Sequence, residues 1–174
     1  GNDLRLLWRL HGYCWAARSA LRVDGDYVEC GVFNGVYSAI MAKTIGWEKV
    51  GKHLSLYDTF RGLAVAQSTS QERAGVQAIY ERDTNEDAVR TMFEPYRNVT
   101  IVKGVVPDSL AEGPDRIAFL HLDMNAAKAE IGALDTLRER LAIGAIFLMD
   151  DYARLEMQGL HEALKSWFRT HDHE

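Results

Sequence analysis

The 174-residue sequence lacks an excess of positive charge and contains only two cysteines. Its 20 lysines and arginines are outnumbered by 25 aspartates and glutamates, which gives a formal net charge of −5, and the basic residues are scattered. A nucleic-acid-binding face needs clustered positive charge, so we expect no nucleic acid as a partner. Cys14 and Cys30 do not form the pattern of a disulfide framework, and we expect two reduced thiols.

Long hydrophobic runs are missing as well. No apolar stretch approaches the roughly 20 residues that a membrane-spanning helix needs, and no secretory signal peptide is visible. These absences predict a cytoplasmic protein without a membrane partner. Because 174 residues suffice for one sizeable core, we expect a single domain over residues 1–174, with an N-terminal helix over 1–22 and a Rossmann-like core over 26–174.

The sequence does contain apolar strands that alternate with helical patterns. Strands are predicted over residues 27–30, 53–57, 99–102, 117–122 and 144–149, and helices over 4–21, 36–45, 85–93, 126–141 and 154–169. Residues 61–84 are polar and weakly patterned, which predicts a mobile loop or lid followed by part of a helix. Continuous apolar strands separated by helices are typical of a parallel sheet covered on both faces, so we predict a doubly wound α/β domain.

The first predicted strand ends in a glycine turn, Glu29-Cys30-Gly31-Val32-Phe33-Asn34-Gly35, before a helix begins. Ligands of parallel sheets bind beyond the carboxyl ends of the strands, where glycine lets the backbone approach closely. A dinucleotide turn would have the spacing G-x-G-x-x-G. The spacing E-x-G-x-x-x-G is similar instead to the S-adenosylmethionine (SAM) loop of class I methyltransferases. The alternative is a tight turn without a ligand.

Asp58 ends the second predicted strand, where a carboxylate can accept both hydroxyls of an adenosine ribose. NAD-binding proteins use the same arrangement, so this residue favours an adenosine ligand without separating SAM from NAD. The alternative is that Asp58 caps the turn Asp-Thr-Phe.

Three carboxylates follow the last two predicted strands, at Asp123, Asp150 and Asp151. If these strands are neighbours, the carboxylates converge, and their repulsion favours a bound cation, with Mg²⁺ or Ca²⁺ preferred by oxygen ligands. A cation there can lower the pKa of a substrate hydroxyl. The alternative is that Asp150 caps the last helix and Asp151 is solvated. His121 is expected to be a core histidine with satisfied hydrogen bonds.

Together these residues resemble a known family. Four blocks carry the resemblance, with support from Lys103-Gly104 and Asp108-Ser109-Leu110: Asp26–Gly35, Tyr57–Leu63, His121–Asp123 and Asp150–Tyr152. They are similar to the macrocin O-methyltransferase (TylF-like) family of SAM- and Mg²⁺-dependent enzymes, which methylate hydroxyls, often on sugars of natural products. The resemblance implies that Asp123, Asp150 and Asp151 bind the metal and serve catalysis. It implies SAM contacts from Glu29, Gly31, Phe33, Asn34, Gly35, Asp58, Thr59 and Gly104.

Two features depart from the family pattern. Sugar-methylating members usually carry a second acid two residues after the first metal ligand, and this sequence has Asn125, which cannot accept a proton. The family's sheet continues with an antiparallel hairpin after the last helix, whereas this sequence stops at Glu174. Either the sequence is incomplete, or the sheet edge is supplied by a partner, which would make the protein a homo-oligomer.

The leading hypothesis is therefore an O-methyltransferase that acts on a hydroxyl of a small molecule, a sugar or a natural product. One alternative is a catalytically degenerate SAM-fold domain that serves binding or assembly, and another is an NAD-dependent oxidoreductase. Among the aromatic residues near the N-terminus, Trp8, Tyr13 and Trp15 are expected to pack in the core.

Overall fold

A computed structural model describes residues 2–171, apart from the side chains of residues 2–6 and the surroundings of Gly75. A five-stranded sheet, with every strand parallel, has the order β3-β2-β1-β4-β5. Its strands are β1 (Asp26–Cys30), β2 (Leu54–Asp58), β3 (Val99–Lys103), β4 (Ile117–Leu122) and β5 (Leu141–Met149). The α-helices are α1 (Asn2–Ala20), α2 (Val36–Ile45), α3 (Ser70–Asp83), α4 (Glu86–Phe93), α5 (Ala127–Leu137) and α6 (Gln158–Thr170). This architecture confirms the predicted doubly wound α/β fold.

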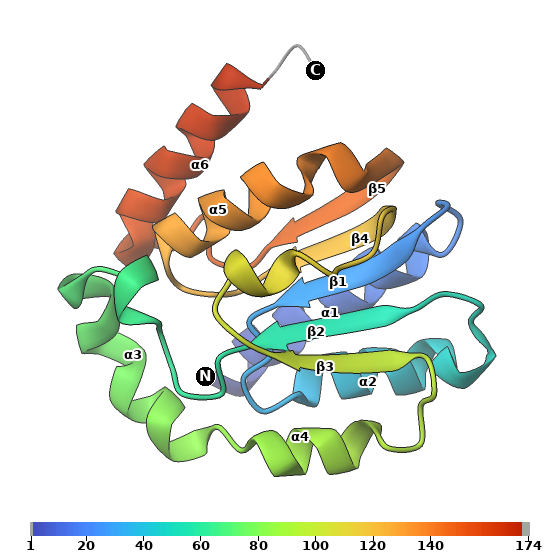
Figure 1. The fold of residues 1–174 in the computed structure, drawn as a ribbon. Helices are drawn as coiled ribbons and strands as arrows, with labels where there is room; N and C mark the ends of the chain where they lie inside the picture. The colour runs from blue at the N-terminus through green and yellow to red at the C-terminus, as the bar shows by residue number, and fades with distance from the viewer. Residues whose placement is uncertain (1, 172–174) are drawn as a thin grey trace.

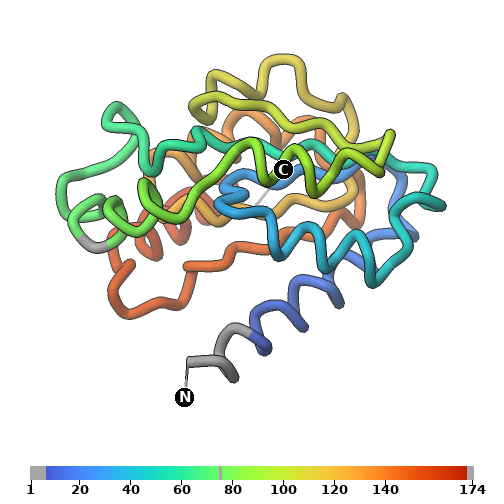
Figure 2. The backbone as a smooth tube through the Cα atoms, turned by 90° about the horizontal axis from the view of Figure 1, so that it is seen from below, coloured from blue at the N-terminus to red at the C-terminus, as the bar shows by residue number. Residues whose placement is uncertain are grey.

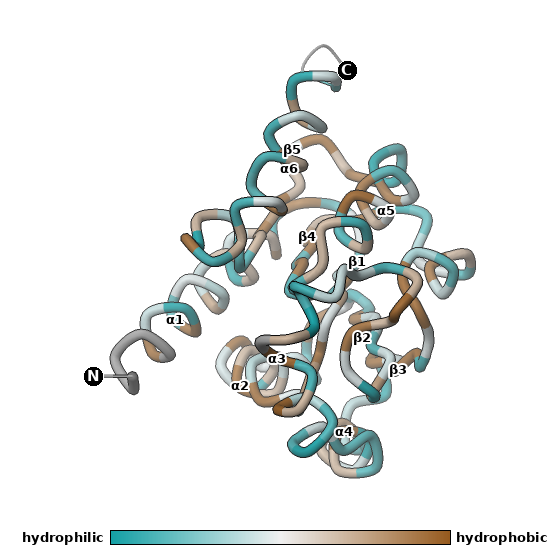
Figure 3. Tube along the Cα trace, turned by 90° about the vertical axis from the view of Figure 1, so that its left-hand side faces the viewer, coloured by the Kyte–Doolittle hydropathy of each residue, from teal (hydrophilic) through white to brown (hydrophobic). Residues whose placement is uncertain are grey.

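Helices cover both faces of the sheet (Figure 1). Adjacent strand residues point to opposite faces: Tyr27 packs with residues of α1, α2 and α4, whereas Val28 packs with residues of α5 and α6. Figure 2, from below, shows α2 and α4 lying side by side. In Figure 3 the strands are largely hydrophobic, and the helices alternate in hydropathy from turn to turn. The strands are therefore buried on both sides, which explains their continuous apolar sequences.

The order of strands reverses between β1 and β4, which are neighbours in the sheet. Backbone pairing continues one residue beyond these strands, because the N–H of Asp123 bonds the carbonyl of Cys30 and the N–H of Asp150 bonds the carbonyl of Leu122, at 2.9 and 3.1 Å. The first residues after β1, β4 and β5 are thereby held at one level of the sheet's carboxyl edge. The predicted neighbourhood of the last two strands is confirmed.

The structure corrects three expectations. The helix predicted over 126–141 ends at Leu137. Leu141 instead begins β5, where it pairs with Ile117 of β4. The observed strand is longer than the predicted one, because it includes an irregular stretch at Gly144 (φ 83°). The last helix begins at Gln158, later than predicted. Residues 61–84 contain a complete helix, α3, whose start is fixed by a capping box between Thr69 and Glu72.

The helix α3 lies beyond the carboxyl ends of the strands (Figure 1). Glu72 also accepts a hydrogen bond from the N–H of Ala127 at the start of α5 (2.9 Å), and Lys128 donates to the carbonyl of Ala66 (2.7 Å). These contacts join the segment 61–84 to the helix that follows β4.

The aromatic residues of α1 differ from the expectation. Tyr13 is buried in the core, but Trp8 and Trp15 are 74% and 65% exposed, so the prediction of core packing is wrong for both tryptophans. Seven positions apart on one helix, they lie on the face turned away from the sheet. Among the described residues, no helix is long and apolar enough to cross a membrane. The expected self-association stays a prediction.

Candidate active site

A cavity of about 460 Å³ lies between the loops that follow β1, β2, β3 and β4. Eight of the residues predicted for the site line it: Glu29, Gly31, Phe33, Asn34, Asp58, Thr59, Gly104 and Asp123. Gly35, Asp150 and Asp151 are not among its lining residues. The volume is within the range of small-molecule sites.

The glycine turn owes its course to two left-handed glycines. At Gly31 (φ 94°), an added Cβ would lie 2.0 Å from the carbonyl oxygen of Asp123, so only glycine lets the backbone after β1 pass that after β4. Gly35 (φ 75°) precedes α2, and a Cβ there would lie 3.2 Å from the side chain of Val89 on α4. The first glycine therefore shapes the cavity floor, whereas the second allows two helices to pack.

Asp58 holds the glycine turn in place. One carboxylate oxygen, Oδ2, accepts hydrogen bonds from the N–H groups of Val32 and Phe33 at 2.7 and 2.8 Å. The other, Oδ1, accepts from the N–H of Phe60 at 2.7 Å, which is the turn predicted for Asp-Thr-Phe. Burial raises the pKa of Asp58, and these three hydrogen bonds oppose that rise. The capping role is thus present, and ribose binding by the same carboxylate stays a prediction.

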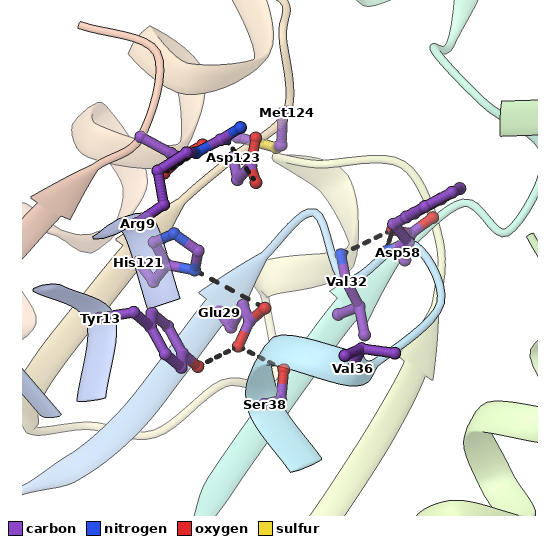
Figure 4. A network of polar contacts seen from close by, with 12 residues as sticks. Arg9, Tyr13, Glu29, Val32, Val36, Ser38, Asp58, His121, Asp123 and Met124 are labelled. Carbon is purple, nitrogen blue, oxygen red and sulfur yellow. Dashed lines mark hydrogen bonds and ion pairs between the residues drawn. The ribbon is translucent and has the colours of Figure 1, made fainter. Parts of the chain in front are cut away.

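Glu29 is a buried carboxylate with two hydroxyl partners (Figure 4). Its Oε2 atom accepts hydrogen bonds from the hydroxyls of Tyr13 on α1 (2.5 Å) and Ser38 on α2 (2.7 Å). Its Oε1 atom lies 3.6 Å from Nδ1 of His121 on β4. Burial and the charge of Glu29 raise the pKa of Tyr13 well above its ordinary value, so this hydroxyl remains a donor.

A second cluster of charge lies at the ends of β4 and β5. His121, Asp123 and Asp150 each offer one ligand atom, and these three atoms lie within 4.8 Å of one another. Arg9 of α1 reaches both carboxylates: its Nε donates to Asp150 (3.0 Å), and its Nη2 pairs with Asp150 and lies 3.7 Å from Asp123. Desolvation raises the pKa of Asp123 to about 6, and Asp151 adds to the rise while His121 and Arg9 oppose it.

Asp151 is not one of these three residues. It is fully buried, and its Oδ1 accepts a hydrogen bond from Arg154 at 2.8 Å. The alternative of a solvated Asp151 is therefore wrong, and so is helix capping by Asp150, because Met157 precedes α6. The structure brings Asp123 and Asp150 together and leaves Asp151 beside Arg154.

A comparison with known protein families decides the identity. The profile of macrocin O-methyltransferases (TylF) matches residues 9–173. The chain belongs to the macrocin O-methyltransferase family. Membership makes it an O-methyltransferase and implies SAM as its methyl donor, which replaces the NAD-dependent alternative.

Solved methyltransferase structures share the fold. The O-methyltransferase NovP superposes with a TM-score of 0.78 at 22% identity, covering 95% of this chain and 72% of that chain. CalS11, a calicheamicin methyltransferase, superposes with a TM-score of 0.69 at 21% identity, covering 95% of this chain and 74% of that chain. Its apo structure, described as a TDP-rhamnose 3′-O-methyltransferase, gives 0.67 at 21% identity, covering 96% and 75%. No curated protein matches the sequence.

In this member of the macrocin O-methyltransferase family, Asn125 lines the cavity at 3% exposure and has a left-handed backbone (φ 54°). Its Nδ2 donates to Asp123 Oδ1 at 3.2 Å, while its Oδ1 has no hydrogen-bond partner among the described residues. Below it, the buried Glu130 accepts from the N–H of Met124 (3.3 Å), and burial and Asp151 raise the pKa of Glu130 to about 8. Asn125 thus orients Asp123 rather than serving as a base.

Sequence reasoning missed two functional candidates, Arg9 and His121. Residues two apart on a strand point to the same face, so His121 could have been paired with Asp123 from spacing alone. Contrary to expectation, neither ring nitrogen of His121 makes a hydrogen bond within residues 2–171, although the side chain is 1% exposed. Arg9 gave no signal, because its partners lie more than 110 residues away along the chain.

Proposed function

We propose that this enzyme transfers the methyl group of SAM to a hydroxyl of a small molecule, a sugar or a natural product, with the help of a divalent cation. The observation that carries the proposal is the meeting, at one cavity, of the glycine turn after β1 and Asp123, the carboxylate after β4 that lies beside Asp150. A sugar acceptor is supported by the description of CalS11, which acts on TDP-rhamnose.

The proposed SAM site is the half of the cavity between the glycine turn and the loop after β2. Its backbone is held by the three hydrogen bonds to Asp58, so its shape is fixed before a ligand binds. Glu29 supplies negative charge where the ammonium group of SAM would lie, and Asp58 supplies a carboxylate for ribose hydroxyls. The remaining proposed contacts come from Gly31, Phe33, Asn34, Gly35, Thr59 and Gly104.

The proposed cation site is formed by the acidic residues after β4 and β5. Asp123 and Asp150 fit a cation, because a positively charged group, the Arg9 guanidinium, already lies against both. Asp151, predicted as a third ligand, has an Oδ2 atom that is buried without a hydrogen-bond partner among the described residues. A divalent cation bound there would supply positive charge that favours loss of the acceptor's hydroxyl proton.

The chain's own contribution is alignment. In the reaction, the bond between the methyl carbon and the sulfonium sulfur breaks as the bond to the acceptor oxygen forms. S-adenosylhomocysteine leaves, and the hydroxyl proton passes to a carboxylate of the acidic cluster and from there to water. Holding the two reactants in line lowers the barrier, because the entropy of bringing them together is lost on binding. Tyr80 of α3, which contacts Phe33 edge-to-face and lines the cavity, helps to enclose the reactants.

A second candidate is a degenerate domain that binds SAM without catalysis, and Asn125 favours it because an amide cannot accept a proton. One experiment separates the two candidates. Transfer of label from SAM to a panel of hydroxylated sugars and phenols is measured alongside S-adenosylhomocysteine binding by calorimetry. The matched variants are Asp123→Asn at the site and Asp87→Asn, an exposed position on α4.

The proposal expects S-adenosylhomocysteine to bind, and it expects methyl transfer that is lost in Asp123→Asn and kept in Asp87→Asn. Binding without any transfer would establish the degenerate domain. Absence of binding would refute both candidates.

A further inference from the structure

Tyr80 is a residue of α3 whose side chain lines the cavity. Its ring meets the ring of Phe33, in the glycine turn, edge-to-face with centroids 5.3 Å apart. Helix α3 itself lies beyond the carboxyl ends of the strands (Figure 1). The two rings therefore connect the glycine turn to the segment 61–84, and together they form an aromatic wall of the cavity.

The hydroxyl end of Tyr80 lies toward the acidic cluster. Burial raises the pKa of this hydroxyl, and the charges of Asp123 and Asp151 raise it further. Arg154 and Arg9 oppose the rise. Charges have this influence only at short range. Tyr80 thus extends from the glycine turn, which its ring contacts, to the carboxylates after β4 and β5.

The hydroxyl of Tyr80 is also available to a ligand. None of the described residues makes a hydrogen bond with it. Because burial keeps the hydroxyl protonated, it can donate a hydrogen bond to an oxygen atom inside the cavity.

Phe33 holds its ring in the wall with a left-handed backbone (φ 53°), a conformation that bulky residues rarely adopt. The carboxylate of Asp58 fixes this conformation by accepting a hydrogen bond from the N–H of Phe33 at 2.8 Å. Strained residues of this kind cluster at ligand-binding sites. The backbone of Phe33 therefore points, independently of Tyr80, to the wall as a part of the site that contacts a ligand.

We propose that Phe33 and Tyr80 bind the methyl acceptor, whose ring lies against the aromatic wall with its reacting hydroxyl toward Asp123. This inference rests on the proposed function, which places SAM at the glycine turn and the hydroxyl at the acidic cluster. An acceptor between these two places lies alongside Tyr80. The wall selects acceptors that present a flat apolar face, such as a phenol or the hydrogen-bearing face of a sugar ring. Tyr80 is thereby a specificity-determining residue.

The test measures methyl transfer from labelled SAM, with MgCl₂ present, to catechol and to methyl rhamnoside, two ring compounds that each carry neighbouring hydroxyls. Tyr80→Leu and Phe33→Leu remove a ring but keep an apolar side chain, and Tyr80→Phe keeps the ring without its hydroxyl. The matched control is Tyr96→Leu. Tyr96 is also half-buried and pairs with a phenylalanine, Phe93, at 6.0 Å, but it is not among the residues that line the cavity. Calorimetry measures the S-adenosylhomocysteine affinity of every variant.

The proposal expects Tyr80→Leu to raise the KM of the methylated compound by about tenfold, at the upper end of what an aromatic pair contributes. The kcat should change little, because the lost contact binds the acceptor before and during the reaction alike. Phe33→Leu should raise KM in the same direction, and Tyr80→Phe should recover most of the loss. The control should match the wild type, and S-adenosylhomocysteine affinity should stay near the wild-type value throughout. If Tyr80→Leu fails to fold, Phe33→Leu decides.

An unchanged KM in Tyr80→Leu, or an equal rise in Tyr96→Leu, would overturn the assignment of the wall. So would a loss that is explained by weaker S-adenosylhomocysteine binding, or transfer to neither ring compound. Transfer by the wild type with a KM that ignores Tyr80 would leave the methyltransferase proposal standing. Absence of S-adenosylhomocysteine binding by the wild type would refute the methyltransferase proposal, and the acceptor assignment with it.

Discussion

Arg9 occupies the position of a cation between Asp123 and Asp150, so replacing it offers a sharp test of the cluster. Arg9→Met keeps most of the side chain's length and apolar stem but removes its charge. The two carboxylates then face each other without compensation. We expect the metal-free variant to be less stable than the wild type and to bind a divalent ion more tightly.

The magnitude follows from the geometry. Two unit charges at the 3.7 Å that separates Arg9 Nη2 from Asp123 attract by about 4.5 kcal/mol at an effective dielectric of 20. Because the Arg9 side chain is 33% exposed, solvent screening reduces this to about 2 kcal/mol. If Arg9 and a metal ion exclude each other, removal of the Arg9 charge should strengthen metal binding by the same 2 kcal/mol or so, which corresponds to about 30-fold tighter binding.

Urea unfolding followed by circular dichroism, with EDTA and with excess MnCl₂, measures both effects. Arg18→Met is the matched control, because Arg18 lies on the same helix and its side chain donates to the carbonyl of Thr44, away from the acidic cluster. An unfolding free energy in EDTA equal to that of the wild type would refute the electrostatic reasoning. Unchanged Mn²⁺ affinity would show that Arg9 and the ion do not compete.

Three further predictions concern the fold around the site. Gly31→Ala should lower the unfolding free energy by about 3 kcal/mol or more, because the alanine Cβ would lie 2.0 Å from the carbonyl oxygen of Asp123 and the backbone there has φ 94°. The control is Gly12→Ala in α1, where the added Cβ meets open space, and it should be neutral or stabilising in the same urea titration. Burial raises the pKa of Glu130 from an ordinary 4.5 to about 8. Between roughly pH 5 and 8, Glu130 therefore holds a proton in the folded state that it has lost in the unfolded chain. The free energy of unfolding should fall by up to about 1.4 kcal/mol per pH unit across that range. Glu130→Gln should remove that slope, and identical pH profiles for both proteins would contradict the assignment. Burial raises the pKa of the Cys30 thiol. An aromatic disulfide reagent at about pH 8 should therefore label only the half-buried Cys14 in the folded protein, and both thiols once urea unfolds it. Rapid labelling of two thiols in the native protein would count against the packing of β1.

Local patterns predicted the sheet well because its strands are buried on both faces. A strand covered by helices on both sides must be apolar throughout, and such runs are visible in sequence at Ile117–Leu122, where the predicted and observed bounds coincide. Helix ends were less predictable. The residues Arg138–Arg140 form a tighter turn, whose position depends on where β5 pairs with β4.

Periodicities along the chain were enough to predict the doubly wound fold, the glycine turn and the positions of Asp58 and Asp123 at strand ends. Which side chains share the acidic cluster depends on how distant segments pack, and local patterns do not contain that information. Arg9 joins it from a helix far away in sequence, and Arg154 donates to one carboxylate oxygen of Asp151 while the other stays without a hydrogen-bond partner among the described residues. Burial left both ring nitrogens of His121 without a hydrogen-bond partner among the described residues, and burial and pairing depend on contacts between segments that no local pattern records.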